Sequence, residues 1–210
     1  MVFGSKIYEY VNIKQDPQLR YTVLAGLLNV SRCPNCGRRS THSRPFIYSD
    51  PAHSLLVYVD PTPDISDEAR RDTLERLLLV RQKVGIEVSY RVHMKEKVQA
   101  NIGERGGGVT TESMQSRKEA PSLHVVFGLK QLYGLINAAL SQQERLGRLA
   151  LRTFSQREAE RGQLLDIARK FAAELQCQVD VEIVSGEYTV WLYGSRRRIG
   201  AIMRELAPQG

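Results

Sequence analysis

The chain is poor in cysteine, with three in 210 residues, and it has no long apolar run. Three cysteines cannot all pair, and Cys33 and Cys36 are spaced like metal ligands rather than a disulfide framework, which indicates a reducing compartment. No apolar stretch reaches the roughly 18 to 20 residues of a membrane helix, and the N-terminal MVFGSKIYEY lacks the layout of a secretion signal. The sequence therefore predicts a cytoplasmic protein without a membrane span.

Catalytic motifs are missing as well. The sequence has no G-x-G-x-x-G, P-loop, H-E-x-x-H or G-x-S-x-G pattern, and its triple glycine at 106–108 lacks the strand and helix that a phosphate-binding loop needs. Four aspartates lie where turns and helix caps favour this residue, and we interpret them as structural: Asp50, Asp60, Asp64 and Asp67. We therefore predict that the protein is not an enzyme.

Lysine is scarce beside arginine. The 30 basic residues are 8 Lys and 22 Arg, and the formal net charge is +7 with a pI near 9.4. The planar guanidinium group binds phosphate and carboxylate through two parallel hydrogen bonds, so an arginine-rich surface suits nucleic acid or an acidic protein face. The alternative is an arginine-rich coding bias with a solvated surface.

Apolar periodicity predicts two units in an α+β fold. The first, residues 1–153, has strands at 6–12, 45–48, 55–59, 86–93 and 123–127, helices at 16–28, 66–84 and 129–151, and a mobile loop at 95–121. It is a mixed α/β body that contains a zinc-ribbon-like knuckle and an antiparallel hairpin. The second, residues 154–210, is a small basic α-β-β-α module: a capping box at Ser155 opens a helix to Leu175, a hairpin spans 178–193, and Ser195 caps a last helix.

Six motifs follow one another in the order of a known family. They are Asn12, Asp16-Pro17, Gly26-Leu-Leu-Asn29, Cys33-Pro-x-Cys36-Gly37, Tyr48-x-Asp50 and Val125-Val-Phe-Gly128-Leu. Together they resemble the CpXC domain, a bacterial domain of poorly defined function, over about residues 5–150. The resemblance implies a site built from two CPxC pairs. The first pair is expected just before Ser5, where this sequence has Met1-Val-Phe-Gly4 instead.

The Cys33-Pro-Asn-Cys36-Gly37 segment is typical of a metal knuckle. Two cysteines at this spacing hold one tetrahedral ion, and the glycine permits the turn that points backbone N–H groups at the thiolates. Structural zinc takes four ligands, so further ones are needed. His42 is the candidate third ligand. The fourth ligand would be a residue that the fold brings close to the knuckle, or it would come from a symmetric partner. The candidates in this chain are His53, His93, His124 and Cys177. A redox pair and two metal-free thiols in a packed turn stay open as alternatives.

Arg196, Arg197 and Arg198 occupy the first turn of the predicted last helix. Cations are disfavoured there by the helix dipole, and a bound anion would reverse that preference. Trp191 and Tyr193 share one face of the preceding strand, so they are a candidate stacking platform beside the arginines. The alternative is that the aromatic rings pack on helices and the arginines meet acidic residues.

Arg38, Arg39 and Arg44 form a second basic cluster beside the knuckle. The first functional hypothesis is a non-catalytic binding protein that docks these basic clusters on RNA, DNA or a ribonucleoprotein. The second is a structural subunit or adaptor of a protein complex, in which an acidic protein surface, a homodimer partner or a larger assembly is the partner. A third is a thiol or metal enzyme centred on Cys33 and Cys36.

Overall fold

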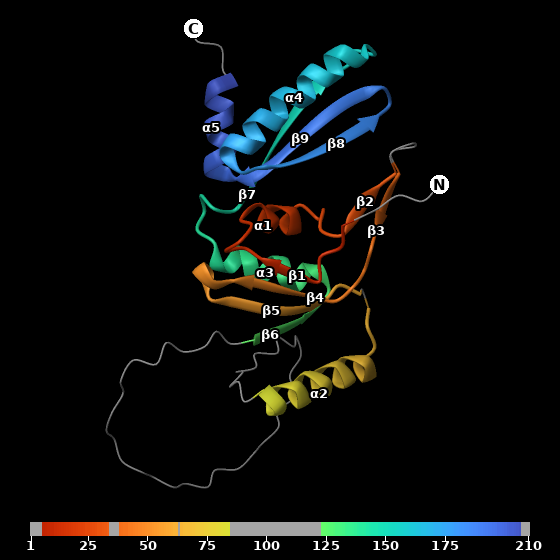
Figure 1. The fold of residues 1–210 in the computed structure, drawn as a ribbon, viewed down its shortest axis with the longest axis vertical. Helices are drawn as coiled ribbons and strands as arrows, with labels where there is room; N and C mark the ends of the chain where they lie inside the picture. Colours follow the sequence, from red (N-terminus) through yellow and green to blue (C-terminus); the bar gives the residue numbers. More distant parts are fainter. Residues whose placement is uncertain (1–5, 34–37, 63, 85–122, 207–210) are drawn as a thin grey trace, which may run out of the picture.

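The computed structural model describes residues 6–33, 38–62, 64–84 and 123–206, which form two stacked halves (Figure 1). The lower half holds a four-stranded sheet in the order β1-β4-β5-β6, where β1 pairs in parallel with β4, β4 is antiparallel to β5, and β5 is parallel to β6. These strands are β1 (Tyr10–Asn12), β4 (Phe46–Asp50), β5 (Leu55–Asp60) and β6 (Leu123–Phe127).

Two helices, α1 (Gln18–Leu24) and α3 (Leu129–Ala139), cover one face of this sheet. Alternate strand residues such as Val11, Tyr48 and Val57 are fully buried beneath them, as strand geometry predicts. α2 (Asp67–Val84) lies on the opposite side (Figure 1). A separate antiparallel hairpin, β2 (Val30–Arg32) with β3 (Arg39–Thr41), flanks this half, and a short 3-10 turn, η1 (Pro51–His53), links β4 to β5.

The upper half holds a three-stranded antiparallel sheet in the order β7-β9-β8. Its strands are β7 (Leu146–Thr153), β8 (Gln178–Val184) and β9 (Glu187–Ser195). Its helices, α4 (Glu158–Leu175) and α5 (Arg196–Leu206), cover one face, with Val190, Leu192 and Ile202 fully buried between sheet and helices. The other face lies on α1, and the Thr22 hydroxyl donates to Gln178 Oε1 at 3.3 Å.

Most predicted elements are confirmed, including the two hairpins β4–β5 and β8–β9 and the helices α1 to α5, and the mixed α and β architecture holds. The expected helix through Leu146, Leu149 and Leu151 is wrong, because these residues form β7 and pair with β9. The predicted capping box at Ser155 is also wrong. The α4 helix begins at Glu158, and the Ser155 hydroxyl accepts the Arg157 N–H instead.

Some expectations fall outside the described residues: the strand at 86–93, the loop at 95–121, and the turn of the knuckle. The division of the chain at residue 153 stays a prediction, although the strand pairing places β7 in the sheet of the second unit. Within the described part of the chain, no helix combines the length and the apolar character that crossing a membrane requires.

Candidate functional site

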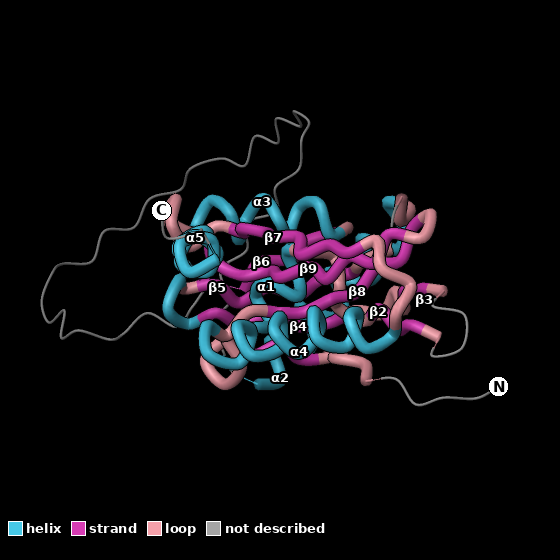
Figure 2. Tube along the Cα trace, turned by 90° about the horizontal axis from the view of Figure 1, so that it is seen from above, coloured by secondary structure: helices cyan, strands magenta, loops and turns pink. Residues whose placement is uncertain are grey.

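The two predicted basic clusters lie at opposite ends of the molecule. Arg38 and Arg39 belong to the β2–β3 hairpin, whereas Arg196, Arg197 and Arg198 begin α5, and both views place these elements on opposite sides (Figures 1 and 2). The structure therefore does not combine the clusters into one surface.

The β2–β3 hairpin carries the described part of the knuckle. The Cys33 N–H donates to the Arg38 carbonyl at 2.9 Å, so the two residues face each other at the end of the hairpin. His42 lies four residues beyond Arg38, roughly 13 Å along the strand. Its Nε2 lies 3.1 Å from the Ser31 hydroxyl. The structure thus separates His42 from Cys33, and Cys36 lies outside the described residues.

Cys177 is also remote from the knuckle. It lies at the end of α4 in the upper core with 2% of its surface exposed, and burial raises the pKa of its thiol. Across the described residues, no three His, Cys, Asp or Glu side chains cluster in a way that would hold a metal ion. Because Cys36 lies outside the described residues, zinc at the knuckle stays a prediction.

Arg39 is neutralised by an acidic residue of the upper sheet. Its guanidinium pairs with Asp180 of β8, and Arg32 of β2 contacts the other oxygen of the same carboxylate at 3.4 Å. These contacts join the hairpin to the upper half. Arg38 is exposed beside them.

Trp191 and Tyr193 are stacked on each other, and both are partly exposed. Their ring centroids lie 6.2 Å apart with 22° between the planes. The indole N–H of Trp191 donates to Glu182 at 2.9 Å, and the Arg148 guanidinium lies 5.7 Å from the indole ring. Tyr193 packs against the lower core, and burial raises the pKa of its hydroxyl. Tyr193 therefore belongs to the packing between the halves, whereas the printed contacts of Trp191 lie within the upper sheet.

The first turn of α5 has its backbone donors already used. The Arg196 and Arg197 N–H groups donate to the carbonyls of Arg145 and Gln143 at 2.9 and 3.1 Å, and the Arg198 N–H donates to the Ser195 hydroxyl at 3.2 Å. Ser195 is thus the predicted cap. An anion would have to bind the arginine side chains rather than the helix N-terminus.

Three arginines of α5 carry unneutralised charge. The side chains of Arg196, Arg197 and Arg204 are exposed, and none forms an ion pair with another described residue. The Arg198 guanidinium donates to the Gln176 side chain at 2.9 Å.

An open cleft of about 780 Å³ lies between α5 and the lower half. Arg197, Arg198 and Arg204 line one wall, and Arg20 of α1 lines the other, with Glu144 the single acidic residue of the described lining. Hydrogen bonds from Ser141 to the carboxylate lower the pKa of Glu144. The cleft has the volume of a ligand site and a net positive lining.

A buried ion pair holds Arg20 at the cleft. Its guanidinium Nε and Nη2 donate to Asp50 Oδ2 at 3.0 and 2.7 Å, and Asp50 is 1% exposed. The His53 Nδ1 lies 3.1 Å from both oxygens of Asp50, its Nε2 lies 3.5 Å from Glu144, and the Tyr48 hydroxyl donates to Asp50. The network fixes the arginine in one orientation.

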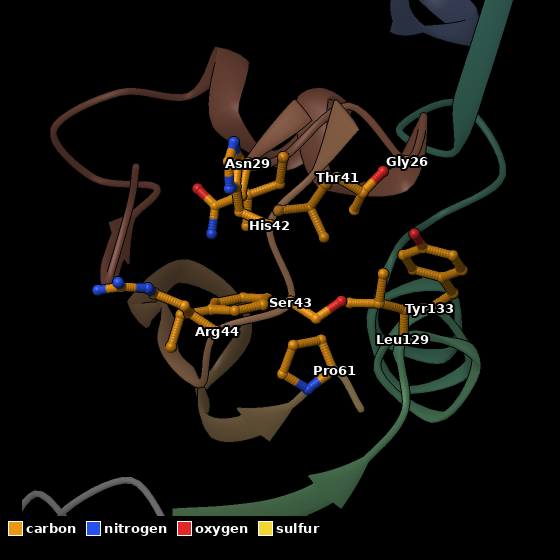
Figure 3. A pocket seen from close by; sticks show the side chains of 12 residues that line it. Gly26, Asn29, Thr41, His42, Ser43, Arg44, Pro61, Leu129 and Tyr133 are labelled. Atoms are coloured by element: carbon orange, nitrogen blue, oxygen red, sulfur yellow. The ribbon is translucent and has the colours of Figure 1, made fainter. Parts of the chain in front are cut away.

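A second pocket lies between the 41–46 segment, which includes His42, and the side chains of Leu129 and Tyr133 of α3 (Figure 3). Its volume is about 40 Å³. One water needs roughly 10 to 15 Å³ measured in this way, so the pocket has room for about three waters. It is too small for a nucleotide or a comparable ligand.

Arg20 and Asp50 were not predicted as site residues. Asp50 was interpreted as a turn residue, and it is the acidic end of a buried pair. One feature of the sequence could have revealed the pair. Arg20 is the lone charged residue of α1, and it lies within a run of six buried residues, Leu-Arg-Tyr-Thr-Val-Leu. A buried arginine needs an acidic partner, and sequence does not say which one.

Comparison with known protein families supports the resemblance that the six sequence motifs indicate. Residues 1–139 match the family model of the CpXC protein. No curated protein and no solved structure matches the chain. The match spans more than half of the sequence and includes the cysteine pair, the β4 motif and the strand β6. The chain therefore belongs to the CpXC family.

Proposed function

We propose that this protein is a non-catalytic nucleic-acid-binding protein that uses the arginines of α5 and the adjoining cleft. The observation that carries the proposal is the exposure of Arg196, Arg197 and Arg204 without an acidic partner among the described residues. Unpaired guanidinium groups that gather at an open cleft attract phosphate, because they form charge-assisted bidentate hydrogen bonds with it.

The cleft strengthens this interpretation through its balance of charge. Its four arginines oppose one carboxylate, and that carboxylate, Glu144, already accepts hydrogen bonds from Ser141. Asp50 compensates the charge of Arg20, so the free positive charge of the cleft comes from Arg197, Arg198 and Arg204. A phosphate backbone that passes along α5 would meet Arg197 and Arg204 first.

The experiment measures fluorescence anisotropy of labelled DNA and RNA oligonucleotides with the full chain at low salt. The double variant Arg197→Ala/Arg204→Ala is expected to bind at least tenfold more weakly than the native chain. The matched control is Arg157→Ala/Arg169→Ala, at the residue before α4 and within α4. It removes the same charge from two exposed i,i+3 ion pairs, and its affinity should stay within twofold. Equal losses of affinity in both variants would show that binding depends on the net charge of the protein and not on the arginines of α5. No binding of any nucleic acid would overturn the proposal.

Zinc at the hairpin stays a prediction for the whole chain. Elemental analysis of gently purified protein tests it. One zinc per chain would indicate a completed site, and half a zinc per chain would indicate a site shared between two copies. The nucleic-acid proposal does not depend on the result.

A structural subunit or adaptor is the second candidate, and α2 favours it. None of its side chains at 67–79 is buried, and Leu78 and Leu79 are 39% and 57% exposed. Apolar side chains on a loosely packed helix suit a protein partner or a second copy. Light scattering over a range of protein concentrations tests self-association. A stable oligomer that Leu78→Ser/Leu79→Ser returns to monomer supports this candidate, and a monomer at all concentrations removes the homodimer.

A further inference from the structure

His53 lies between a buried carboxylate and a carboxylate of the cleft. Its Nδ1 is 3.1 Å from both oxygens of Asp50, and its Nε2 is 3.5 Å from Oε1 of Glu144. The Nη2 of Arg20 lies 3.2 Å from the same Nδ1. The turn that carries His53 joins β4 to β5 at the opposite end of the lower half from the hairpin that carries Cys33 (Figures 1 and 2). Both ring nitrogens of His53 are therefore engaged beside the cleft and not at the knuckle.

A neutral imidazole cannot match both carboxylates, because it carries one N–H and its other nitrogen is an acceptor. With the proton on Nδ1, His53 donates to Asp50 and turns the lone pair of Nε2 toward Glu144. With the proton on Nε2, the ring faces Glu144 correctly, but the lone pair of Nδ1 then points at Asp50. Only the doubly protonated imidazolium presents an N–H to each carboxylate. The contacts around the ring therefore change with its protonation state.

Protonation of His53 also changes the charge of the cleft. Among the described residues, the charged groups that face the ring are Arg20 from α1, Asp50 from β4, and Glu144 from the connection between α3 and β7. The titratable hydroxyl of Tyr48 contacts Asp50 from β4. Asp50 and Arg20 compensate each other. The described residues therefore offer Glu144 a compensating charge only when His53 is protonated.

Glu144 is the carboxylate that a bound phosphate would meet. It is the single acidic residue of the described cleft lining, and its side chain is 44% exposed. The Ser141 N–H donates to Oε2 at 3.2 Å, which leaves Oε1 for His53, and the Tyr21 hydroxyl donates to the Glu144 carbonyl at 3.2 Å. These contacts hold the carboxylate at the cleft, where it opposes the α5 arginines and repels phosphate.

We propose that His53 is a pH switch of the cleft, in which its protonation neutralises Glu144 and strengthens the binding of nucleic acid. This inference rests on the proposed nucleic-acid binding and adds the regulation of the same site. Histidine is the side chain whose ordinary pKa allows a change of charge between about pH 5 and 8. The sign follows from the charges: the protonated cleft is more positive, so affinity rises as the pH falls. By linkage, nucleic acid that prefers the protonated form takes up a proton as it binds.

The test measures fluorescence anisotropy with the full chain at constant ionic strength between pH 5.5 and 8, using whichever labelled DNA or RNA oligonucleotide binds the native chain more tightly. The native affinity is expected to rise about fivefold as the pH falls, which is the effect of one charge at ion-pair distance in water. His53→Gln should keep the affinity that the native chain has at pH 8 throughout the range. The control His42→Gln removes another half-buried histidine, whose Nε2 contacts the Ser31 hydroxyl, and should retain the native pH dependence.

A second variant tests the same switch from the exposed side of the cluster. Glu144→Gln removes the repelling carboxylate, so it should bind at pH 8 about as tightly as the native chain does at pH 5.5. Calorimetry in two buffers of different ionisation enthalpy counts the protons taken up on binding at pH 6.5. The native chain should take up part of a proton, and His53→Gln should take up almost none. Urea unfolding verifies that the variants fold.

The outcomes separate this inference from the proposed function. If the native affinity is the same at pH 5.5 and pH 8, the switch is wrong and nucleic-acid binding through the arginines stands. The same holds if His53→Gln keeps the native pH dependence, or if Glu144→Gln binds at pH 8 no more tightly than the native chain. If the native chain binds no nucleic acid at any pH in this range, both proposals fail.

Discussion

At the scale of single residues, the buried pair of Arg20 and Asp50 joins α1 to the end of β4. Their side chains are 11% and 1% exposed, and His53 and Tyr48 complete the hydrogen bonding around the carboxylate. A buried pair of this kind contributes little net stability over an apolar pair, but breaking it leaves a charge without compensation. The pair holds Arg20 at the cleft.

The substitution Asp50→Asn keeps the shape of the side chain and removes its charge. We expect the free energy of unfolding to fall by about 3 to 5 kcal/mol, because the Arg20 cation stays buried without a counterion. Urea unfolding measures the change. In the control Glu160→Gln, which breaks the exposed Arg157–Glu160 pair, the loss should be within about 1 kcal/mol. Equal midpoints for Asp50→Asn and the native chain would show that the pair is not buried as described.

Tyr48 makes the stability depend on alkaline pH. Burial, followed by the charge of Asp50, raises the pKa of its hydroxyl above the usual value of about 10. The folded state thus keeps a proton that the unfolded state loses, so stability is complete below about pH 10 and falls as the pH rises, with a slope that steepens toward about 1.4 kcal/mol per pH unit above pH 11. Urea unfolding between pH 9 and 11 checks this slope. Tyr48→Phe should lower stability at pH 8 and flatten the decline, and an unchanged slope would contradict the assignment.

At the scale of elements, the end of α4 packs on β9 through a close approach between a cysteine and a glycine. A Cβ added to Gly194 would lie 2.6 Å from the Cys177 sulfur, which is shorter than real contacts allow. Cys177 is therefore explained by this packing in the upper core.

We expect Gly194→Ala to destabilise the protein by about 1 to 3 kcal/mol through overpacking. The double variant Gly194→Ala/Cys177→Ala should lose less than the sum of the single variants, because removing the sulfur makes room for the new methyl group. Chemical unfolding of the four proteins gives the coupling energy. Gly162→Ala is the control, and it should be neutral or stabilising because nothing lies near its Cβ. Simple additivity at positions 177 and 194 would contradict the contact.

Sequence patterns predicted the local elements well and failed where the pairing partner is distant. The β8–β9 hairpin was predictable because Ser185 and Gly186 form a tight turn with positive φ angles of 50° and 85°. The β7 strand was not, since Leu146 and Leu149 have helical spacing over a short segment and the partner strand begins only at Glu187. Arg196, Arg197 and Arg198 were predicted as an anion site. Arg204 was not predicted, and the meeting of α5 with Arg20 at one cleft follows from the packing of the two halves.

At the scale of the whole molecule, the exposed positive charge is unevenly placed. The hairpin arginines at one end are partly neutralised by Asp180, whereas the α5 arginines at the other end have no acidic partner among the described residues. The net charge of +7 therefore has a directional effect on association. A polyanion would approach the end that carries α5.

The dependence of nucleic-acid affinity on salt concentration tests whether a polyanion binds at the end that carries α5. Each phosphate contact on duplex DNA contributes about 0.9 to the slope of log K against log salt. We expect the affinity of the native chain to fall steeply with salt. The slope should be shallower by roughly 1.8 for Arg197→Ala/Arg204→Ala and unchanged for Arg157→Ala/Arg169→Ala. Binding that does not weaken with salt, or a slope that the two α5 substitutions leave unchanged, would contradict the account.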